Sequence, residues 1–381
     1  MNQQTYKWLD RLFRPIQWLV GFATGVAGFL LCLEAAGNGL GMGPLLRFLF
    51  VMLLAFATTI IHELGHYAAA KWSGMTVTQV RFGRIEVIPQ QRGWRVRWNT
   101  QQKIRMGGFV VAVCDARRPM RPQVLFMIAG GPVANLVTAV ICAALAALWS
   151  SVPAGSLAVA FAIFNTGAGI INLLPTTRVS GTDGMRLLIW RRKELEHSPT
   201  LASTRLQALC IAGVTADLLP VDQIAALDSQ AMPMPLSALW YRLKGHQNRG
   251  EWLLAAQLQE TYDQLMEGVP KPTKAKLVAS SAYLRTELAF SRAMQNRDAA
   301  ALNDNLLPKA MAWSVPSLWP RCLALRALLH GDIADAQKLL DDVKRFAEQS
   351  MDKALPQSEA MIRRHMLALT TGGAIMSKDA A

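Results

Sequence analysis

Residues 44–70 read PLLRFLFVMLLAFATTIIHELGHYAAA, an apolar run long enough to cross a membrane as one helix. Only Arg47, Glu63 and the histidines His62 and His66 interrupt it with ionisable groups. Such groups are costly within a span and usually face a protein interior or a water-filled cavity, which makes them functional candidates. The segment therefore predicts a membrane helix that carries a polar site.

The polar residues form the pattern HELGH at residues 62–66. Histidines four residues apart lie one above the other on a helix face and can bind one Zn²⁺ together, while the glutamate between them can deprotonate a water molecule. A helix that enters the membrane near Leu45 carries His62 about 25 Å across a hydrocarbon core about 30 Å thick. The pattern favours a zinc protease whose metal lies toward the far side of the membrane from Pro44.

The long apolar runs all precede Pro175, although hydrophobic residues make up 52% of the whole 381-residue chain. Four runs are long enough to span a bilayer. They lie at about residues 16–36, 45–69, 124–149 and 156–174. The sequence predicts an α-helical integral membrane protein with about four transmembrane helices, followed by a soluble all-α domain.

The basic residues are concentrated in the membrane half. Residues 1–197 contain 20 Lys and Arg against 8 Asp and Glu, whereas the remainder contains 20 against 18, within a net charge of +14. The excess basic residues lie before the first span, between the second and third spans, and after the fourth. By the positive-inside rule both termini are cytoplasmic and the HELGH helix runs from outside to inside. Nucleic acid is therefore not expected as a partner.

The first 37 residues could instead form a signal peptide, because a basic start and an apolar run lead to Ala35-Ala36-Gly37. The apolar stretch exceeds the usual length of about 7–15 residues, which favours an uncleaved span.

Asp183 is the candidate for a third metal ligand, since a catalytic zinc site usually takes three protein ligands. It follows the fourth span, on the same predicted cytoplasmic side as the two histidines, and no other carboxylate occurs between Asp115 and Glu194. The remaining histidines lie beyond the last span and are expected to be ordinary surface or helix residues: His197, His246, His330 and His365.

Three motifs over residues 45–190 resemble the site-2 protease family of intramembrane zinc metalloproteases. They are the HELGH pattern, a G-P-x-x-N motif at Gly131-Pro132-Val133-Ala134-Asn135, and an N-x-x-P motif at Asn172 and Pro175 followed by Asp183-Gly184. Family members commonly have Leu-Asp-Gly-Gly shortly after this proline. Here the sequence is Thr182-Asp183-Gly184-Met185, so the preceding loop is longer and the second glycine is missing.

The resemblance implies a three-helix core in which His62, His66 and Asp183 bind Zn²⁺. Glu63 would deprotonate the water that hydrolyses a peptide bond in or near the transmembrane segment of a single-span protein. The resemblance also implies that Asn135 orients the substrate or stabilises an oxyanion. An interhelical hydrogen bond is the open alternative for Asn135, as it is for Asn165 and Asn172. A bacterial inner membrane is the implied location.

Residues 76–98, TVTQVRFGRIEVIPQQRGWRVRW, alternate β-forming residues around a break at 89–93 and predict a short β-hairpin. In the family a β-like loop dips into the membrane at this place, and its edge could add a strand to an unwound substrate. A solvated hairpin whose arginines contact lipid phosphates is the alternative.

Three domains are expected: a membrane-embedded metalloprotease domain at 1–193, a cytoplasmic helical domain at 194–370 and a flexible tail at 371–381. Similar segments at 296–300 and 330–334 are offset by 34 residues, which suggests tetratricopeptide-like helix pairs, with an irregular helical domain as the alternative. Such a domain could bind a cytoplasmic protein partner. The competing functions are a non-catalytic membrane scaffold, which would be free to lose Glu63, and a maturation protease for small secreted peptides.

Overall fold

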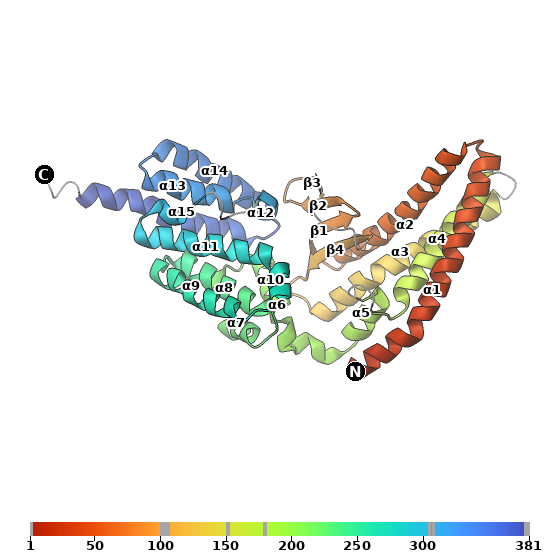
Figure 1. Cartoon of the computed structure of the whole chain (residues 1–381), viewed down its shortest axis with the longest axis horizontal. Coiled ribbons are helices and arrows are strands. Elements are labelled where there is room, and N and C mark those ends of the chain that lie inside the picture. Colours follow the sequence, from red (N-terminus) through yellow and green to blue (C-terminus); the bar gives the residue numbers. More distant parts are fainter. Residues whose placement is uncertain are drawn as a thin grey trace. The chain divides into compact units, whose positions relative to one another are not determined.

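The computed structural model describes residues 3–99, 107–149, 153–177, 181–303, 306 and 309–376. The chain forms two compact units (Figure 1). Unit 1 comprises Met1–Pro89 and Gly93–Glu196, and unit 2 comprises Gln90–Arg92 and His197–Ala381. Each unit is described by itself.

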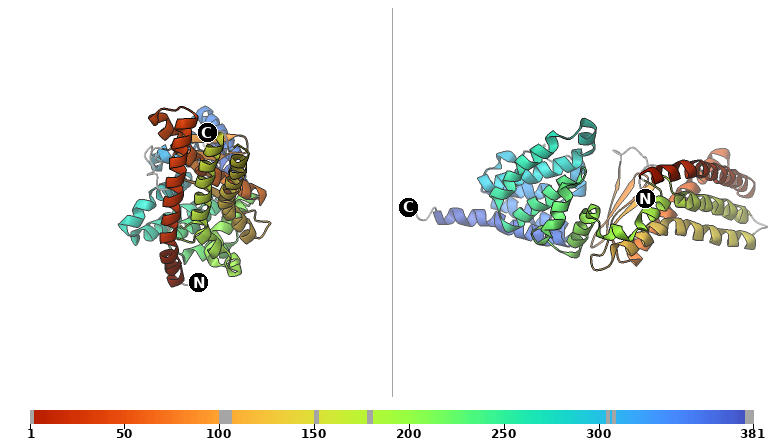
Figure 2. Two further views of the ribbon diagram at one scale, coloured as in Figure 1. Left: turned by 90° about the vertical axis from the view of Figure 1, so that its right-hand side faces the viewer. Right: turned by 90° about the horizontal axis from the view of Figure 1, so that it is seen from below.

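Four long helices form the frame of unit 1, side by side in Figures 1 and 2. Each is long and apolar enough to cross a membrane, which confirms the predicted number of spans. Their outer faces carry exposed large apolar side chains such as Phe22 and Val140, as lipid contact requires. The helices are α1 (Gln3–Glu34, continued by the π-helix Ala35–Gly39), α2 (Pro44–Trp72), α3 (Met120–Leu148) and α4 (Pro153–Leu173).

Helices α2 and α3 approach closely at two glycines. A Cβ atom on Gly65 would lie 2.3 Å from the carbonyl oxygen of Gly130, and one on Gly130 would lie 2.4 Å from that of Gly65. Small residues let membrane helices pack backbone against backbone in this way. The contact brings the HELGH face of α2 against the Gly131–Asn135 stretch of α3.

A four-stranded antiparallel sheet lies between α2 and α3 in the sequence, with strand order β3-β2-β1-β4. The strands are β1 (Thr76–Phe82), β2 (Ile85–Pro89), β3 (Trp94–Trp98) and β4 (Gly108–Val113). The predicted hairpin corresponds to β2 and β3, paired from Pro89↔Trp94 to Ile85↔Trp98. The sheet is larger than that hairpin because β1 turns into β2 at Gly83, which has a φ of 56°, and because β4 pairs with the other edge of β1.

The chain returns to the bundle after α4 through the short helix α5 (Asp183–Trp190), which packs against α3 and α4. The Thr182 side chain caps this helix by accepting a hydrogen bond from the Met185 N–H. Arg121 of α3 donates to the carbonyl oxygens of Trp190 and Arg191 at its other end, 3.0 and 2.7 Å away. Both ends of α5 are therefore held.

The regular secondary structure of unit 2 is entirely helical in its described residues. Its α-helices are α6 (Ala202–Ala212), α7 (Val221–Asp228), α8 (Met234–Arg249), α9 (Trp252–Glu267), α10 (Lys271–Lys276), α11 (Val278–Asn296), α12 (Lys309–Ser314), α13 (Leu318–Leu329), α14 (Ile333–Gln349) and α15 (Ala354–Met376). Helix α15 extends into the segment predicted as a flexible tail, whose residues 377–381 lie outside the described part. A tetratricopeptide-like repeat stays a prediction.

An ionic network is buried in the core of unit 2. Arg321 donates to Glu359 at 2.7 Å and to Glu287 at 2.5 Å, and Lys244 lies 3.5 Å from the other Glu287 oxygen. Phe290 lies against the Arg321 guanidinium. Because buried charges need partners, this network fixes how α8, α11, α13 and α15 pack together.

Candidate metal centre

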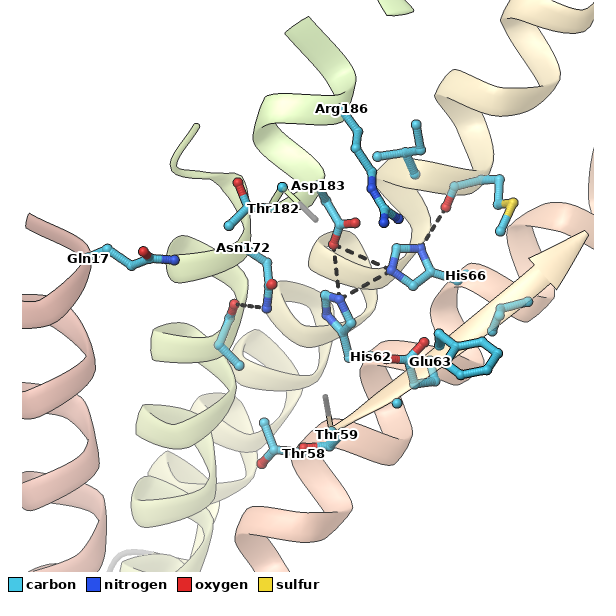
Figure 3. A pocket seen from close by; sticks show the side chains of 18 residues that line it. Gln17, Thr58, Thr59, His62, Glu63, His66, Asn172, Thr182, Asp183 and Arg186 are labelled. Atoms are coloured by element: carbon cyan, nitrogen blue, oxygen red, sulfur yellow. Dashed lines mark hydrogen bonds and ion pairs between the residues drawn. The ribbon is translucent and has the colours of Figure 1, made fainter. Parts of the chain in front are cut away.

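Two histidines of α2 and the first residue of α5 converge in unit 1 (Figure 3). The Nε2 atoms of His62 and His66 lie 3.2 Å apart. An Asp183 carboxylate oxygen lies 3.0 Å from His62 Nε2 and 3.4 Å from His66 Nε2. All three residues are buried. The structure thus brings together the three residues predicted as metal ligands, from positions 121 residues apart in the chain.

The spacing of these three atoms fits a tetrahedral zinc site. Ligand atoms about 2.0–2.2 Å from Zn²⁺ at tetrahedral angles lie about 3.3–3.6 Å from one another. The observed separations of 3.0, 3.2 and 3.4 Å are close to this range. Two imidazoles with one carboxylate form a donor set that suits zinc.

The outer nitrogens of both imidazoles face hydrogen-bond acceptors. His62 Nδ1 lies 2.6 Å from the side-chain oxygen of Asn135, and His66 Nδ1 lies 2.8 Å from the carbonyl oxygen of Met127. These acceptors favour the tautomer in which Nδ1 carries the proton. The Gly131 nitrogen also lies 3.3 Å from His66 Nδ1, but the Met127 oxygen is nearer to that atom. Each Nε2 lone pair is then directed toward Asp183 and is available to a metal.

Gly131 of α3 leaves the space that a metal ion would fill. A Cβ atom at this position would lie 2.5 Å from His66 Nε2 and 2.8 Å from His62 Nε2. A cation bound to both imidazoles would lie in the same region, because zinc binds histidine nitrogen at about 2.0–2.1 Å. The local geometry therefore explains why position 131, the first of the G-P-x-x-N motif, is a glycine.

Glu63 lies beside the histidines and packs against the first residues of β4. It is 6% exposed, and a Cβ atom on Gly108 would lie 2.5 Å from its Cγ atom. Its Oε2 atom has no hydrogen-bond partner among the described residues. The carboxylate is held in place through its stem, while one oxygen is free to accept a proton.

These side chains line a cavity of about 380 Å³. Its wall includes three polar residues that the sequence reasoning did not place in the site: Gln17 of α1, Asn172 of α4 and Arg186 of α5. Residues 107–110 at the start of β4 form another part of the wall. Asn172 and Arg186 belong to the third family-like motif or follow it closely, so their motif context could have indicated them. Gln17 had no such signal.

Asn135, predicted to act in catalysis, lies behind His62 and is not among the residues that line the cavity. It is fully buried. Its amide nitrogen donates to the Thr58 carbonyl at 3.1 Å and to the Asn165 side-chain oxygen at 2.8 Å, and its own oxygen faces His62. Both amide N–H groups are therefore engaged within the protein.

Hydrogen bonds favour the ionised form of Asp183. Burial raises the pKa of its carboxyl, but when the Nε2 atoms of His62 and His66 carry protons, their hydrogen bonds and positive charge outweigh burial and bring the pKa below its usual range. A cation bound to Nε2 would supply the positive charge in place of those protons. A carboxylate rather than a carboxylic acid is the form that binds a metal.

Residues 48–156 match the model of peptidase family M50, the site-2 protease family. This match confirms the resemblance read from the motifs and covers the HELGH pattern and Gly131–Asn135, but it ends before Asp183. No curated protein and no solved structure gave a significant match to the chain. With its four candidate spans, the chain is an integral membrane protein whose membrane half resembles metalloproteases.

Proposed function

We propose that this chain is a zinc-dependent intramembrane endopeptidase that cuts single-span proteins in or near their transmembrane segments. The observation that carries the proposal is the convergence of His62, His66 and Asp183 beside Glu63 in one cavity among membrane helices. A scaffold would have no need to keep the base and three ligand-type residues in this geometry. The family match supports the same reaction class.

Glu63 is the base in this proposal. Zinc bound by His62, His66 and Asp183 would polarise the scissile carbonyl and make water more acidic. Glu63 takes a proton from the water whose oxygen attacks the carbonyl carbon, and returns it to the amine nitrogen as the C–N bond breaks. Its unpartnered Oε2 atom suits that role.

Asn135 enters this proposal as the residue that holds His62. The oxyanion role implied by the resemblance would require its N–H groups to leave Thr58 and Asn165. Asn172 is better placed to contact a substrate, since it lines the cavity while its side chain donates only to Ala168 of its own helix among the contacts described. An amide at this position could polarise a substrate carbonyl.

The substrate would bind in extended form along β4. A transmembrane helix keeps its peptide groups hydrogen-bonded to one another, so a segment must unwind before hydrolysis. Among the described strands β4 pairs only with β1, and its first residues line the cavity next to Glu63. Strand addition at this edge would hold an unwound segment beside the base.

The basic segments support a topology with both termini in the cytoplasm. The resemblance to the family supports a bacterial inner membrane as the location. We assign residues 1–193 to the protease domain, 194–370 to a cytoplasmic helical domain that binds a protein partner, and 371–381 to a tail. The extent of α15 shortens any flexible part of this tail.

Reconstitution tests the function directly. The full chain in lipid vesicles, supplied with a mixture of single-span membrane proteins from its own membrane, should release shortened fragments. A zinc chelator should stop the release and added Zn²⁺ should restore it. Fragment release that persists with fully chelated metal would contradict the proposal.

A further inference from the structure

Two polar side chains of α1 are buried against the loop that leads to Asp183. Asp10 is 7% exposed and Gln17 is 6% exposed. They are seven positions apart, so they lie on one face of the helix. Helix α1 is 32 residues long, about 48 Å at 1.5 Å per residue, which exceeds a hydrocarbon core of about 30 Å. Its first turns can therefore lie beyond the core and contact the loop.

These side chains make three hydrogen bonds to residues 171–177. Asp10 accepts from the Thr177 backbone N–H at 2.7 Å. Gln17 accepts from the Thr176 hydroxyl at 3.1 Å and donates to the Ile171 carbonyl at 3.3 Å. Thr176 is fully buried. Figure 3 shows Gln17 directed from α1 toward the helix that carries Asn172.

The same segment is fastened to the residue before Asp183. The Thr182 backbone N–H donates to the Thr176 carbonyl at 3.0 Å, and the Thr182 hydroxyl donates to the Leu174 carbonyl at 2.6 Å. Gly184 presses against the end of α4, since a Cβ atom there would lie 1.8 Å from the Leu173 carbonyl oxygen. Hydrogen bonds thus connect α1 with Thr176, Thr176 with Thr182, and Thr182 with the start of α5.

We propose that α1 positions the third metal ligand: Asp10 and Gln17 hold the loop after α4 so that Asp183 reaches His62 and His66. The inference rests on the proposed function, because it takes Asp183 as a ligand. It explains how a loop longer than the family pattern still delivers its aspartate. The proposal also gives a role to α1, which lies outside the matched residues 48–156. It requires that α1 is not cleaved off as a signal peptide.

Zinc affinity of the purified full chain tests the proposal. Gln17→Met removes both Gln17 hydrogen bonds at similar side-chain volume, and Gln4→Met is the matched control at an exposed position of α1. We expect Gln17→Met to raise the zinc dissociation constant about 10- to 100-fold, the range typical of residues that orient metal ligands. The control should leave it unchanged. The absorption spectrum of the cobalt-substituted chain should change with Gln17→Met only, because it reports ligand geometry.

A second pair of variants separates the hydrogen bond of Asp10 from its charge. Asp10→Asn keeps an oxygen that can accept from Thr177 and should bind zinc as the native chain does. Asp10→Leu removes the acceptor and should weaken binding. Equal affinity of Asp10→Leu and the native chain, together with an unaffected Gln17→Met, would overturn the proposal.

Combination with Asp183→Ala shows whether Gln17 acts through this ligand. If it does, Gln17→Met causes no further loss of affinity once Asp183 is replaced. A further loss in that background, from misfolding or any other route, would overturn the proposal. If Asp183 is not a zinc ligand, the proposed function itself fails, and Asp183→Ala alone would then leave zinc binding unchanged.

Discussion

Gly131→Ala should weaken zinc binding about 100-fold or more by adding a single methyl group. That methyl would lie 2.5 Å from His66 Nε2, whereas ordinary contacts begin at 3.4 Å, so the imidazole must withdraw by about 0.9 Å. Zinc sites tolerate deviations of about 0.2 Å in ligand distance. Because lost orientation of a ligand alone costs about 10- to 100-fold in affinity, we expect at least the upper end of that range.

Gly25→Ala is the control, because a Cβ atom on Gly25 meets nothing within 4 Å. It should change the zinc dissociation constant by no more than about twofold, as is usual for substitutions that touch nothing. The assay is chelator competition on the purified full chain in detergent, with thermal unfolding recorded alongside. A Gly131→Ala chain that binds zinc as tightly as the native chain would refute this reasoning, since the metal would then lie elsewhere.

Three further outcomes are expected. Gly65→Val should lower the thermal unfolding temperature in detergent, because its side chain has no room against the Gly130 carbonyl; an unchanged temperature would mean that α2 and α3 pack less closely. Arg321→Ala should lower the unfolding free energy of unit 2 by about 3–5 kcal/mol, since it removes the cation paired with buried Glu359 and leaves buried Glu287 with Lys244 alone. Arg345→Ala, which breaks an exposed pair, should cost less than about 1 kcal/mol, and hydrogen exchange of peptides from α11 and α13 measures both effects. Burial raises the pKa of Glu287, but neighbouring cations lower it more, from 4.5 to about 2. The stability that this lowered pKa provides is present above pH 4.5 and is lost as the pH falls toward 2. Protection from hydrogen exchange should therefore fall over this pH range more steeply in the native chain than in Glu287→Gln.

The sequence predicted the four spans and the grouping of His62, His66 and Asp183, because the apolar runs are a local signal and few acids were available near the last span. Four apolar runs correspond to the four candidate membrane helices. Asp183 was the only acid near the end of the fourth run, so its position beside His62 and His66 could be anticipated without knowing the loop that carries it.

The sheet and the surroundings of the site depend on contacts between distant segments, which periodicity does not report. The hairpin of β2 and β3 has a local turn, but β4 pairs with β1 across the intervening strands. Asn135 could be identified as a polar residue in a span, yet only the packing of α2, α3 and α4 reveals that its amide is fully engaged. Gln17 lacked any motif, and its contact lies 159 residues away.

Fragments of single-span membrane proteins, compared between cells that express the native chain and cells that express Glu63→Gln, provide the decisive measurement. The substitution should leave zinc bound to His62, His66 and Asp183 while removing the base. We expect specific single-span proteins to be cut in native cells and to persist uncut with Glu63→Gln. Identical fragment profiles under every stress tested, with both proteins folded and zinc-loaded, would contradict a protease and favour a membrane scaffold.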